Sequence, residues 1–307
     1  MNNNVVAVVV TYNRKDQLVK CVHALLAQTR PLKKIIIIDN NSTDGTELMF
    51  STGIFSENCI LHYVKLFDNI GGAGGFHEGI VRGLELGLEW FWLMDDDALP
   101  HPNALEELFL VVRDKTNIYG SLAKFGNKPS WWVSLKEKTD KFKTVDDVGK
   151  VPPFVEVWFL PFLGFLIHRC VIERIGLPEQ KFFICCDDIE YCERAKKNGV
   201  SIYMAGKSFI EHPKARQAKI NLFFRSINYL SLPPWKMYYD TRNRILLAKK
   251  HYGKRVYYKT LPGIFIRLIY SLIVEKNFYA QLRAYFAGLY DGLLGRGGRL
   301  HEKWKIK

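Results

Sequence analysis

The sequence predicts an α/β fold built on a mostly parallel, doubly wound sheet. Short β-branched runs alternate with stretches of helical periodicity, as in consecutive β-α-β units. The runs are apolar along their whole length, which is typical of strands that are buried on both faces of a parallel sheet. Several runs end in polar or acidic residues, and ligands of such sheets bind outside the carboxyl ends of the strands.

The elements follow in this order along the chain. Residues 5–10 are the first predicted strand, and a helix with apolar residues from Leu18 to Leu26 follows and ends before Pro31. The next buried runs predict strands at residues 35–38, 61–64, 90–94 and 200–204. A short helix is expected at 188–197, after a second apolar stretch at 155–168.

Glycine recurs at every fourth position from Gly71 to Gly87 within a predicted helix. Each interior glycine costs a helix about 1 kcal/mol in intrinsic propensity. Close packing of a neighbouring element, or contact between the backbone and a ligand at the first turn, must offset this cost.

The chain changes character after Pro233-Pro234, where helical, aromatic and basic segments are expected at 235–248 and 260–294. We expect one domain over residues 1–232 and a helical extension over 233–307. Arg267 interrupts the apolar stretch 261–274, so this helix should lie at a membrane interface and not span the bilayer. The alternative is an appendage that packs on the first domain or on a partner subunit.

The net charge of +13, with much of the Lys and Arg excess near the C-terminus, suggests an anionic partner. No nucleic-acid-binding signature accompanies it. The six cysteines lack zinc-site spacing, and we expect reduced thiols in a cytosolic protein. The N-terminus does not resemble a signal peptide, and no apolar run reaches the roughly 20 residues that span a bilayer.

An acidic triplet, Asp95-Asp96-Asp97, follows the predicted strand at 90–94. Clustered carboxylates raise one another's pKa unless a cation neutralises them. Because side chains alternate along a strand, Asp95 and Asp97 should leave it on the same side and form a seat for a divalent cation. The alternative is a cap for the helix that opens near Asn103, but a cap needs only one Asp.

Three further motifs follow predicted strands: Thr11-Tyr12-Asn13-Arg14, Asp39-Asn40-Asn41-Ser42, and the glycine-rich segment from Asn69 to Gly75. A carboxylate after the second strand can bind the N3–H of a pyrimidine or a ribose hydroxyl. A glycine-rich turn that enters a helix can bring backbone N–H groups to a pyrophosphate. Together with a cation at the acidic triplet, these features predict a nucleotide-diphosphate site.

These motifs also carry a resemblance to a known family. Val8-Val-Val-Thr-Tyr-Asn-Arg14, Ile38-Asp-Asn-Asn-Ser-Thr-Asp-Gly45 and the acidic triplet resemble the family-2 inverting glycosyltransferases over residues 5–213. The resemblance implies a GT-A fold, with the triplet as its DXD motif and residues 1–232 as the catalytic domain. Asn69-Ile-Gly-Gly-Ala-Gly-Gly-Phe76 is most similar to bacterial galactofuranosyltransferases, with rhamnosyltransferases second.

The resemblance implies transfer of galactofuranose from UDP-galactofuranose, or alternatively rhamnose from dTDP-rhamnose, to a glycan or lipid-linked acceptor. Such an enzyme of cell-surface polysaccharide synthesis would work in the cytoplasm, peripherally at an anionic inner membrane face. Asp39 would read the uracil or the neighbouring ribose. The expected donor-binding residues are Thr11, Asn13, Arg14, Asp39, Asn69, Gly72 and Asp96. The expected ligands of Mn²⁺ or Mg²⁺ are Asp95, Asp97 and His212.

A second acidic cluster, Asp187-Asp188-Ile189-Glu190, opens the predicted helix at 188–197. Ordinary capping would explain it, since carboxylates are stabilised at helix N-termini. By resemblance Asp188 is the general base that deprotonates the acceptor, and it would share one crevice with the acidic triplet. The remaining residues expected on the acceptor side are Asp187, Glu190, Trp158, Gly164 and Arg242. Asp187 and Glu190 would orient acceptor hydroxyls or the base itself. Arg242 could bind a phosphate or be a surface charge on a helix.

Two other classes of function remain open. A nucleotidyltransferase also uses an α/β sheet, metal carboxylates and a nucleotide pocket, but commonly has a glycine-rich triphosphate loop near its first strand. The segment Thr11-Tyr12-Asn13-Arg14 has no glycine, which counts against this class. A non-catalytic sugar-binding module would not need both acidic clusters intact.

Overall fold

The computed structural model describes residues 4–56, 58–137, 141–214, 217–222, 225–275 and 277–306. The chain divides into two compact units, the first made of residues 1–178 and 191–214 and the second of residues 179–190 and 215–307. The predicted boundary was at 232/233, whereas residues 215–232 and the short segment 179–190 both belong to the second unit.

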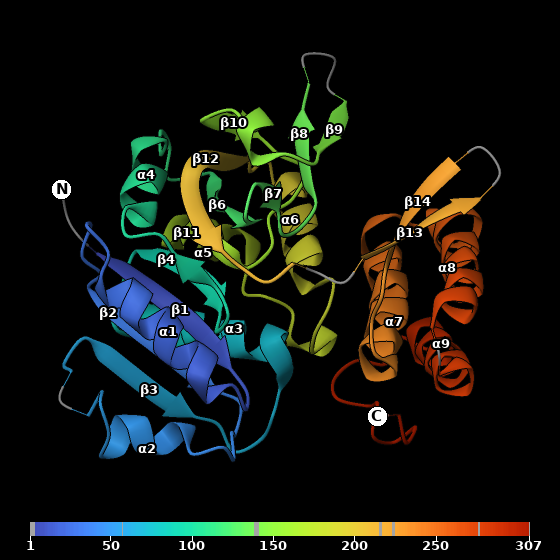
Figure 1. Cartoon of the computed structure of the whole chain (residues 1–307), viewed down its shortest axis with the longest axis horizontal. Coiled ribbons are helices and arrows are strands. Elements are labelled where there is room, and N and C mark those ends of the chain that lie inside the picture. Colours follow the sequence, from blue (N-terminus) through green and yellow to red (C-terminus); the bar gives the residue numbers. More distant parts are fainter. Residues whose placement is uncertain are drawn as a thin grey trace. The chain divides into compact units, whose positions relative to one another are not determined.

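The first unit contains a ten-stranded sheet, in which eight strands follow the order β10-β12-β6-β11-β4-β1-β2-β3 (Figure 1). Their bounds are β1 Val5–Thr11, β2 Lys34–Asp39, β3 Leu61–Lys65, β4 Trp90–Asp95, β6 Ile118–Phe125, β10 Phe154–Glu156, β11 Leu163–His168 and β12 Ile202–Glu211. Two short strands, β5 (Leu99–Pro100) and β7 (Lys128–Pro129), pair with β12 and β6. A separate hairpin joins β8 (Val133–Lys136) and β9 (Phe142–Val145).

The strands of the N-terminal half are parallel, as predicted. β1 pairs in parallel with β2 and with β4, and β2 pairs in parallel with β3. β11 runs antiparallel to both of its neighbours, β4 and β6. All of the predicted strands are present, and β12 continues to Glu211, well beyond its predicted end.

Among the described residues, six α-helices begin in the segments that connect these strands: α1 Lys15–Leu26, α2 Thr46–Ser51, α3 Gly71–Glu85, α4 Ala104–Leu110, α5 Arg169–Ile175 and α6 Asp187–Lys197. The unit boundary falls within α6, after Glu190. Side chains alternate along β1 between the two faces of the sheet. Val5, Ala7 and Val9 join the core that includes Leu18 and Val22 of α1, whereas Val8 and Val10 meet α3.

The glycines on one side of α3 explain why this helix packs so closely against β1. A Cβ atom at Gly75 or Gly79 would overlap the side chain of Val10 or Val8, and one at Gly83 would overlap Phe91. The close approach that the sequence predicted is therefore confirmed, and packing against β1 and β4 offsets the low helix propensity of these glycines.

The second unit is built on α7 Pro234–His251, α8 Leu261–Val274 and α9 Phe278–Leu293, with a short π-helix at Val256–Thr260. The predicted helix at 260–294 is thus interrupted between α8 and α9. A hairpin of β13 (Gln217–Leu222) and β14 (Arg225–Leu230) precedes α7. Within the described ranges, none of the helices combines the length and apolarity needed to cross a bilayer. All six cysteines are free thiols.

Candidate active site

The acidic triplet lies where β4 ends, beside the end of β1. The two strands are parallel neighbours with Val10 opposite Asp95, so their carboxyl ends meet at one edge. Asp96 is 3% exposed and accepts a hydrogen bond from Thr11 Oγ1 at 2.7 Å. Arg14 Nη1 lies 3.2 Å from Asp96 Oδ1 and 2.5 Å from Asp97 Oδ2. One arginine therefore bridges two adjacent carboxylates.

These two carboxylates differ in their pKa. Burial is the largest influence on Asp96 and raises its pKa to about 6, against the opposing effects of Thr11 and Arg14. Burial also acts to raise the pKa of Asp97, but His212 and Arg14 together outweigh it and lower that pKa to about 2. Asp97 is consequently an anion throughout the neutral range.

Asp97 and His212 fit a divalent cation. Asp97 Oδ1 lies 3.3 Å from His212 Nε2. Asp97 Oδ1 and His212 Nδ1 are buried and form no hydrogen bond with any part of the chain that the structure describes. A carboxylate oxygen and an imidazole nitrogen are ligands that suit a divalent transition metal such as Mn²⁺.

Asp95, the third predicted ligand, does not complete this set. Across the described residues, no group of three or more His, Cys, Asp or Glu side chains is arranged to hold a metal ion. The structure thus brings together two of the three predicted ligands. The capping alternative for the triplet is wrong, because Asn103 occupies the N-cap position of α4.

Asp39, at the end of β2, is fully buried. Its Oδ1 accepts from the backbone N–H of Ser42 at 2.8 Å, and its Oδ2 accepts from the hydroxyl of Tyr63 at 2.5 Å. Burial and the contact with Asp39 raise the pKa of Tyr63 well above its ordinary value. Tyr63 was missed from the sequence because it lies within β3 and belongs to no motif; only the parallel pairing of β2 and β3 places it here.

Asparagines connect the loops that follow the first three strands. Asn13, which has a φ of +53°, donates its backbone N–H to Ser42 Oγ at 2.8 Å and accepts from the Thr43 N–H at 2.7 Å. Asn40 Oδ1 accepts from the Ile70 N–H at 3.1 Å.

The glycine-rich turn begins with the same kind of contact. Asn69 Oδ1 accepts from the N–H of Gly71, whose φ is +77°. Gly72, in the first turn of α3, has no atom within 4 Å of where a Cβ would stand. The four predicted strand-end motifs therefore lie at one edge of the sheet, within the first unit.

The two predicted acceptor residues of the first unit have different surroundings. Trp158 is half-buried, and Lys196 Nζ lies 4.9 Å from the centroid of its ring. Gly164 is buried at a bulge in β11 with a φ of +82°, and a Cβ there would overlap Ile210 and Ser121. A buried glycine offers an acceptor no surface, so the geometry supports a packing role for Gly164.

The second acidic cluster lies in the second unit, at the start of α6. Asp187 is buried, and burial followed by the charge of Asp188 raises its pKa to about 8. Burial also raises the pKa of Asp188, to about 6. That this pair shares a crevice with the acidic triplet stays a prediction.

Glu190 is fully buried and lies 3.0 Å from both Lys250 Nζ and His251 Nε2. These partners enclose the carboxylate of Glu190. Glu190 is therefore suited to orienting α6 and not to contacting an acceptor. Lys250 and His251 were missed from the sequence because they stand about 60 residues away, at the end of another helix.

The structure corrects the prediction for Arg242. Its side chain is fully buried, so it is not a surface charge. Nη1 donates to the carbonyl of Gly298 at 2.6 Å, and Nη2 donates to those of Lys181 and Phe182 at 3.0 and 2.9 Å. The guanidinium is occupied by backbone carbonyls, so a phosphate contact is also wrong.

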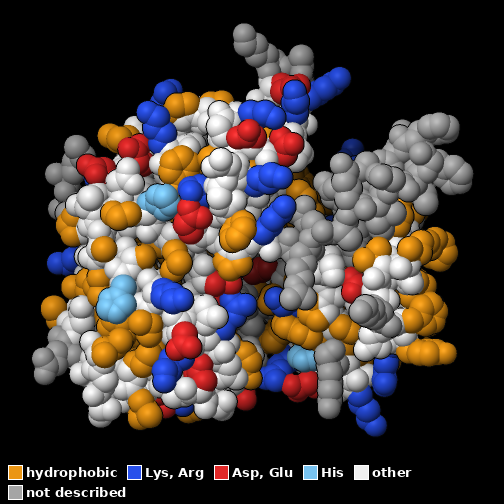
Figure 2. Space-filling view, viewed as in Figure 1, with side chains coloured by type: hydrophobic (Ala, Val, Ile, Leu, Met, Phe, Trp, Pro, Cys, Tyr) orange, Lys and Arg blue, Asp and Glu red, His pale blue; other side chains and the backbone are white. Residues whose placement is uncertain are grey.

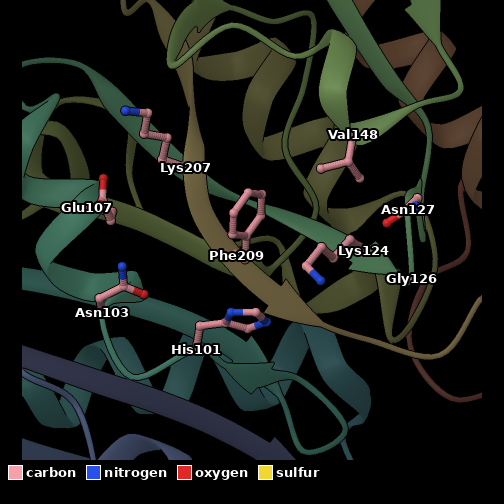
Figure 3. A pocket seen from close by; sticks show the side chains of 9 residues that line it. All are labelled: His101, Asn103, Glu107, Lys124, Gly126, Asn127, Val148, Lys207 and Phe209. Atoms are coloured by element: carbon pink, nitrogen blue, oxygen red, sulfur yellow. The ribbon is translucent and has the colours of Figure 1, made fainter.

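The first unit also has a surface hollow (Figure 3). Its lining residues are His101, Asn103, Glu107, Lys124, Gly126, Asn127, Val148, Lys207 and Phe209. None of them was predicted to belong to the site, and His101 and Lys124 both pair with Glu211. We assign no role to this hollow.

Comparisons with known proteins agree with this geometry. Residues 6–174, more than half of the chain, match the sequence profile described as Glycosyl transferase family 2. Galactofuranosyltransferase GlfT1 of Mycolicibacterium smegmatis is 26% identical over 295 residues, covering 91% of this chain and 93% of that protein. dTDP-rhamnosyl transferase RfbF of Shigella flexneri is 23% identical over 308 residues, covering 97% and 99%.

Solved structures show the same fold. S. aureus TarS 1-349 in complex with UDP-GlcNAc has a TM-score of 0.59 at 13% identity, covering 95% of this chain and 81% of that one. GalNAc-T7 with UDP, GalNAc and Mn²⁺ has a TM-score of 0.62 at 13% identity, covering 94% of this chain but only 55% of that one. The likeness confirms the GT-A fold. With that fold and a family match over more than half of its length, this chain belongs to glycosyl transferase family 2.

Proposed function

We propose that this transferase moves galactofuranose from UDP-galactofuranose to a hydroxyl of a glycan or lipid-linked acceptor, with inversion at the anomeric carbon. The observation that carries the proposal is the convergence of Thr11, Arg14, Asp96, Asp97 and His212 at the end of parallel strands, where such sheets bind nucleotides. The similarity to GlfT1 favours this donor, and the similarity to RfbF makes dTDP-rhamnose the second candidate.

On the donor side, the nucleobase would lie against the loops that the hydrogen bonds of Asp39 and Asn13 hold in place. The carboxylate of Asp39 is already hydrogen-bonded to Ser42 and Tyr63. It would therefore contribute to recognition of the nucleobase by shaping the pocket. The open space beside Gly72 would let diphosphate oxygens reach backbone N–H groups in the first turn of α3. Asn69, bonded to Gly71, would hold that turn in place.

Asp97 and His212 would hold Mn²⁺ or Mg²⁺. When bound, the cation would neutralise charge on the departing nucleoside diphosphate. Arg14 would add a second positive charge and fix the carboxylates of Asp96 and Asp97 relative to each other.

Asp188 would be the general base. It would take the proton from the acceptor hydroxyl as that oxygen attacks the anomeric carbon, so that one displacement inverts the configuration. Burial raises its pKa above that of an ordinary Asp and so makes its carboxylate a stronger base.

We also propose that α8 and α9 contact an anionic membrane surface. Figure 2 shows hydrophobic side chains gathered over these helices, and they include Phe265, Ile266, Ile269, Ile273, Tyr279, Phe286 and Tyr290. Ile273 is 65% exposed and Tyr279 is 83% exposed. The preceding turn carries the basic residues Lys254, Arg255 and Lys259. An apolar face flanked by basic residues is typical of peripheral binding.

A donor screen tests the proposed reaction. The purified protein would receive UDP-galactofuranose, dTDP-rhamnose, UDP-glucose or UDP-galactose with a synthetic sugar acceptor, and release of the nucleoside diphosphate would be measured. We expect the largest acceptor-dependent release from UDP-galactofuranose. Preference for dTDP-rhamnose would support the rhamnosyltransferase alternative. Pyrophosphate release from a nucleoside triphosphate, with no sugar transfer, would overturn the proposal.

A further inference from the structure

The segment that leads into Asp187 has an unusual backbone. Three residues before α6 that are not glycine have positive φ angles: Phe183 at +63°, Cys185 at +70° and Cys186 at +62°. Residues with a Cβ avoid this left-handed region. Such a backbone persists only where the surrounding structure holds it, and it is often found near functional sites.

α7 holds this segment. Asn243 is fully buried, and its Nδ2 lies 2.8 Å from each of the carbonyl oxygens of Phe182, Ile184 and Cys185. A carboxamide nitrogen has two hydrogens, so these three contacts share two donors. Arg242 secures the start of the same segment through the carbonyls of Lys181 and Phe182.

The far end of α7 holds the chain on the other side of the acidic pair. Lys250 and His251 enclose the carboxylate of Glu190, which follows Asp188 by two residues. Asn243 and His251 are eight residues apart, or about 12 Å along one helix. A single rigid element therefore contacts the chain both before and after Asp187 and Asp188.

We propose that α7 sets the position of the acidic pair and that Asn243 is a positioning residue for the base, an inference that rests on the proposed role of Asp188. Asn243 is buried among backbone carbonyls and acts through the segment it holds. Catalytic groups must stay within about 0.5 Å of the productive geometry, and a misplacement of 1 Å can reduce the rate about 100-fold.

The test compares Asn243→Ala with Thr241→Val. Thr241 stands on the same helix and is 1% exposed, and its hydroxyl has no hydrogen-bond partner in the described part of the chain. Folding would be checked by circular dichroism and Tm, and donor binding by calorimetry. For Asn243→Ala we expect kcat to fall about 30- to 100-fold while donor Kd stays within about twofold. The acidic limb of the kcat–pH profile should move to lower pH, because a loosened segment would let water reach the acidic pair. Thr241→Val should keep wild-type values.

Lys250→Met covers the case in which Asn243→Ala does not fold. The Lys250 side chain is 40% exposed, so losing its charge should leave the fold intact while removing one partner of Glu190. We expect kcat to fall about three- to tenfold, and because the charge of Glu190 is then less neutralised, the acidic limb of the kcat–pH profile should move to higher pH.

The outcomes separate the two proposals. If Asp188→Asn kept near-normal kcat, the proposed base would be wrong whatever Asn243→Ala did. If Asp188→Asn were inactive while folded Asn243→Ala, or Lys250→Met in its place, kept wild-type kcat and pH profile, the positioning role would be wrong. Equal losses in Thr241→Val would mean general destabilisation and would also overturn the inference.

Discussion

Asp187 and Asp188 are buried neighbours whose pKa values are both raised and which titrate as a pair, but only Asp188 is the proposed base, so replacing each with Asn should have unequal effects. Burial and the repulsion between the two adjacent carboxylates favour a pair that shares one proton near neutral pH, so that one member is ionised and able to accept a proton. Asn resembles a protonated carboxyl group. Asp188→Asn therefore removes the proposed base, whereas Asp187→Asn mimics a pair whose shared proton sits on Asp187 and leaves Asp188 able to ionise.

General-base catalysis contributes about 10²- to 10⁴-fold, which is about 2.7–5.4 kcal/mol of barrier. We expect kcat of Asp188→Asn to fall by that factor and kcat of Asp187→Asn to fall less than about tenfold. Because the base must be unprotonated, kcat of the wild type should rise with pH as the pair loses its first proton, at a higher pH than an ordinary Asp would require, and then level off. The assay is nucleoside diphosphate release at saturating donor and acceptor from pH 5 to 8. Greater damage from Asp187→Asn than from Asp188→Asn would refute the assignment.

Three further predictions concern the cation, the packing and the surface. A chelator should abolish transfer and Mn²⁺ should restore it, with Asp97→Ala needing a higher Mn²⁺ concentration for half-maximal rate; chelator-resistant transfer would exclude the proposed cation. Gly79→Ala should lower the free energy of unfolding by about 1–3 kcal/mol through overpacking, measured by urea denaturation, while Gly72→Ala at an open position should not. Ile273→Glu should weaken co-sedimentation with anionic vesicles and Leu110→Glu, an exposed site in the first unit, should not; equal binding by both variants would argue against the proposed membrane face.

The sequence predicts much of the first unit because its contacts follow from strand register. Once β1 pairs in parallel with β2 and β4, Thr11 stands opposite Asp39 and Val10 opposite Asp95. Motifs separated by tens of residues then meet at one edge, as expected. The full length of β12 was not predictable, because an irregularity between Ala205 and Phe209 breaks the apolar run.

Side chains that act across the fold could not be predicted in the same way. Tyr63 reaches Asp39 from the middle of an apolar strand, where aromatic residues usually fill the core. Lys250 and His251 stand at the end of a helix, where basic residues are expected for reasons of the helix dipole alone. Nothing in their spacing along the chain links them to Glu190.

Arg242 shows why a motif can mark an important residue and still mislead about its role. A buried guanidinium is costly unless its donors are satisfied, and here carbonyl oxygens and the ring of Tyr239, 4.7 Å from Arg242 Cζ, replace water. These hydrogen bonds hold residues 181–182, which lead to Asp187 and Asp188. Loss of Arg242 should therefore resemble loss of a substrate contact in a simple activity assay. Only separate measurements of donor Kd, kcat and Tm would distinguish a displaced base from a missing phosphate ligand, since the latter would raise donor Kd and leave Tm unchanged.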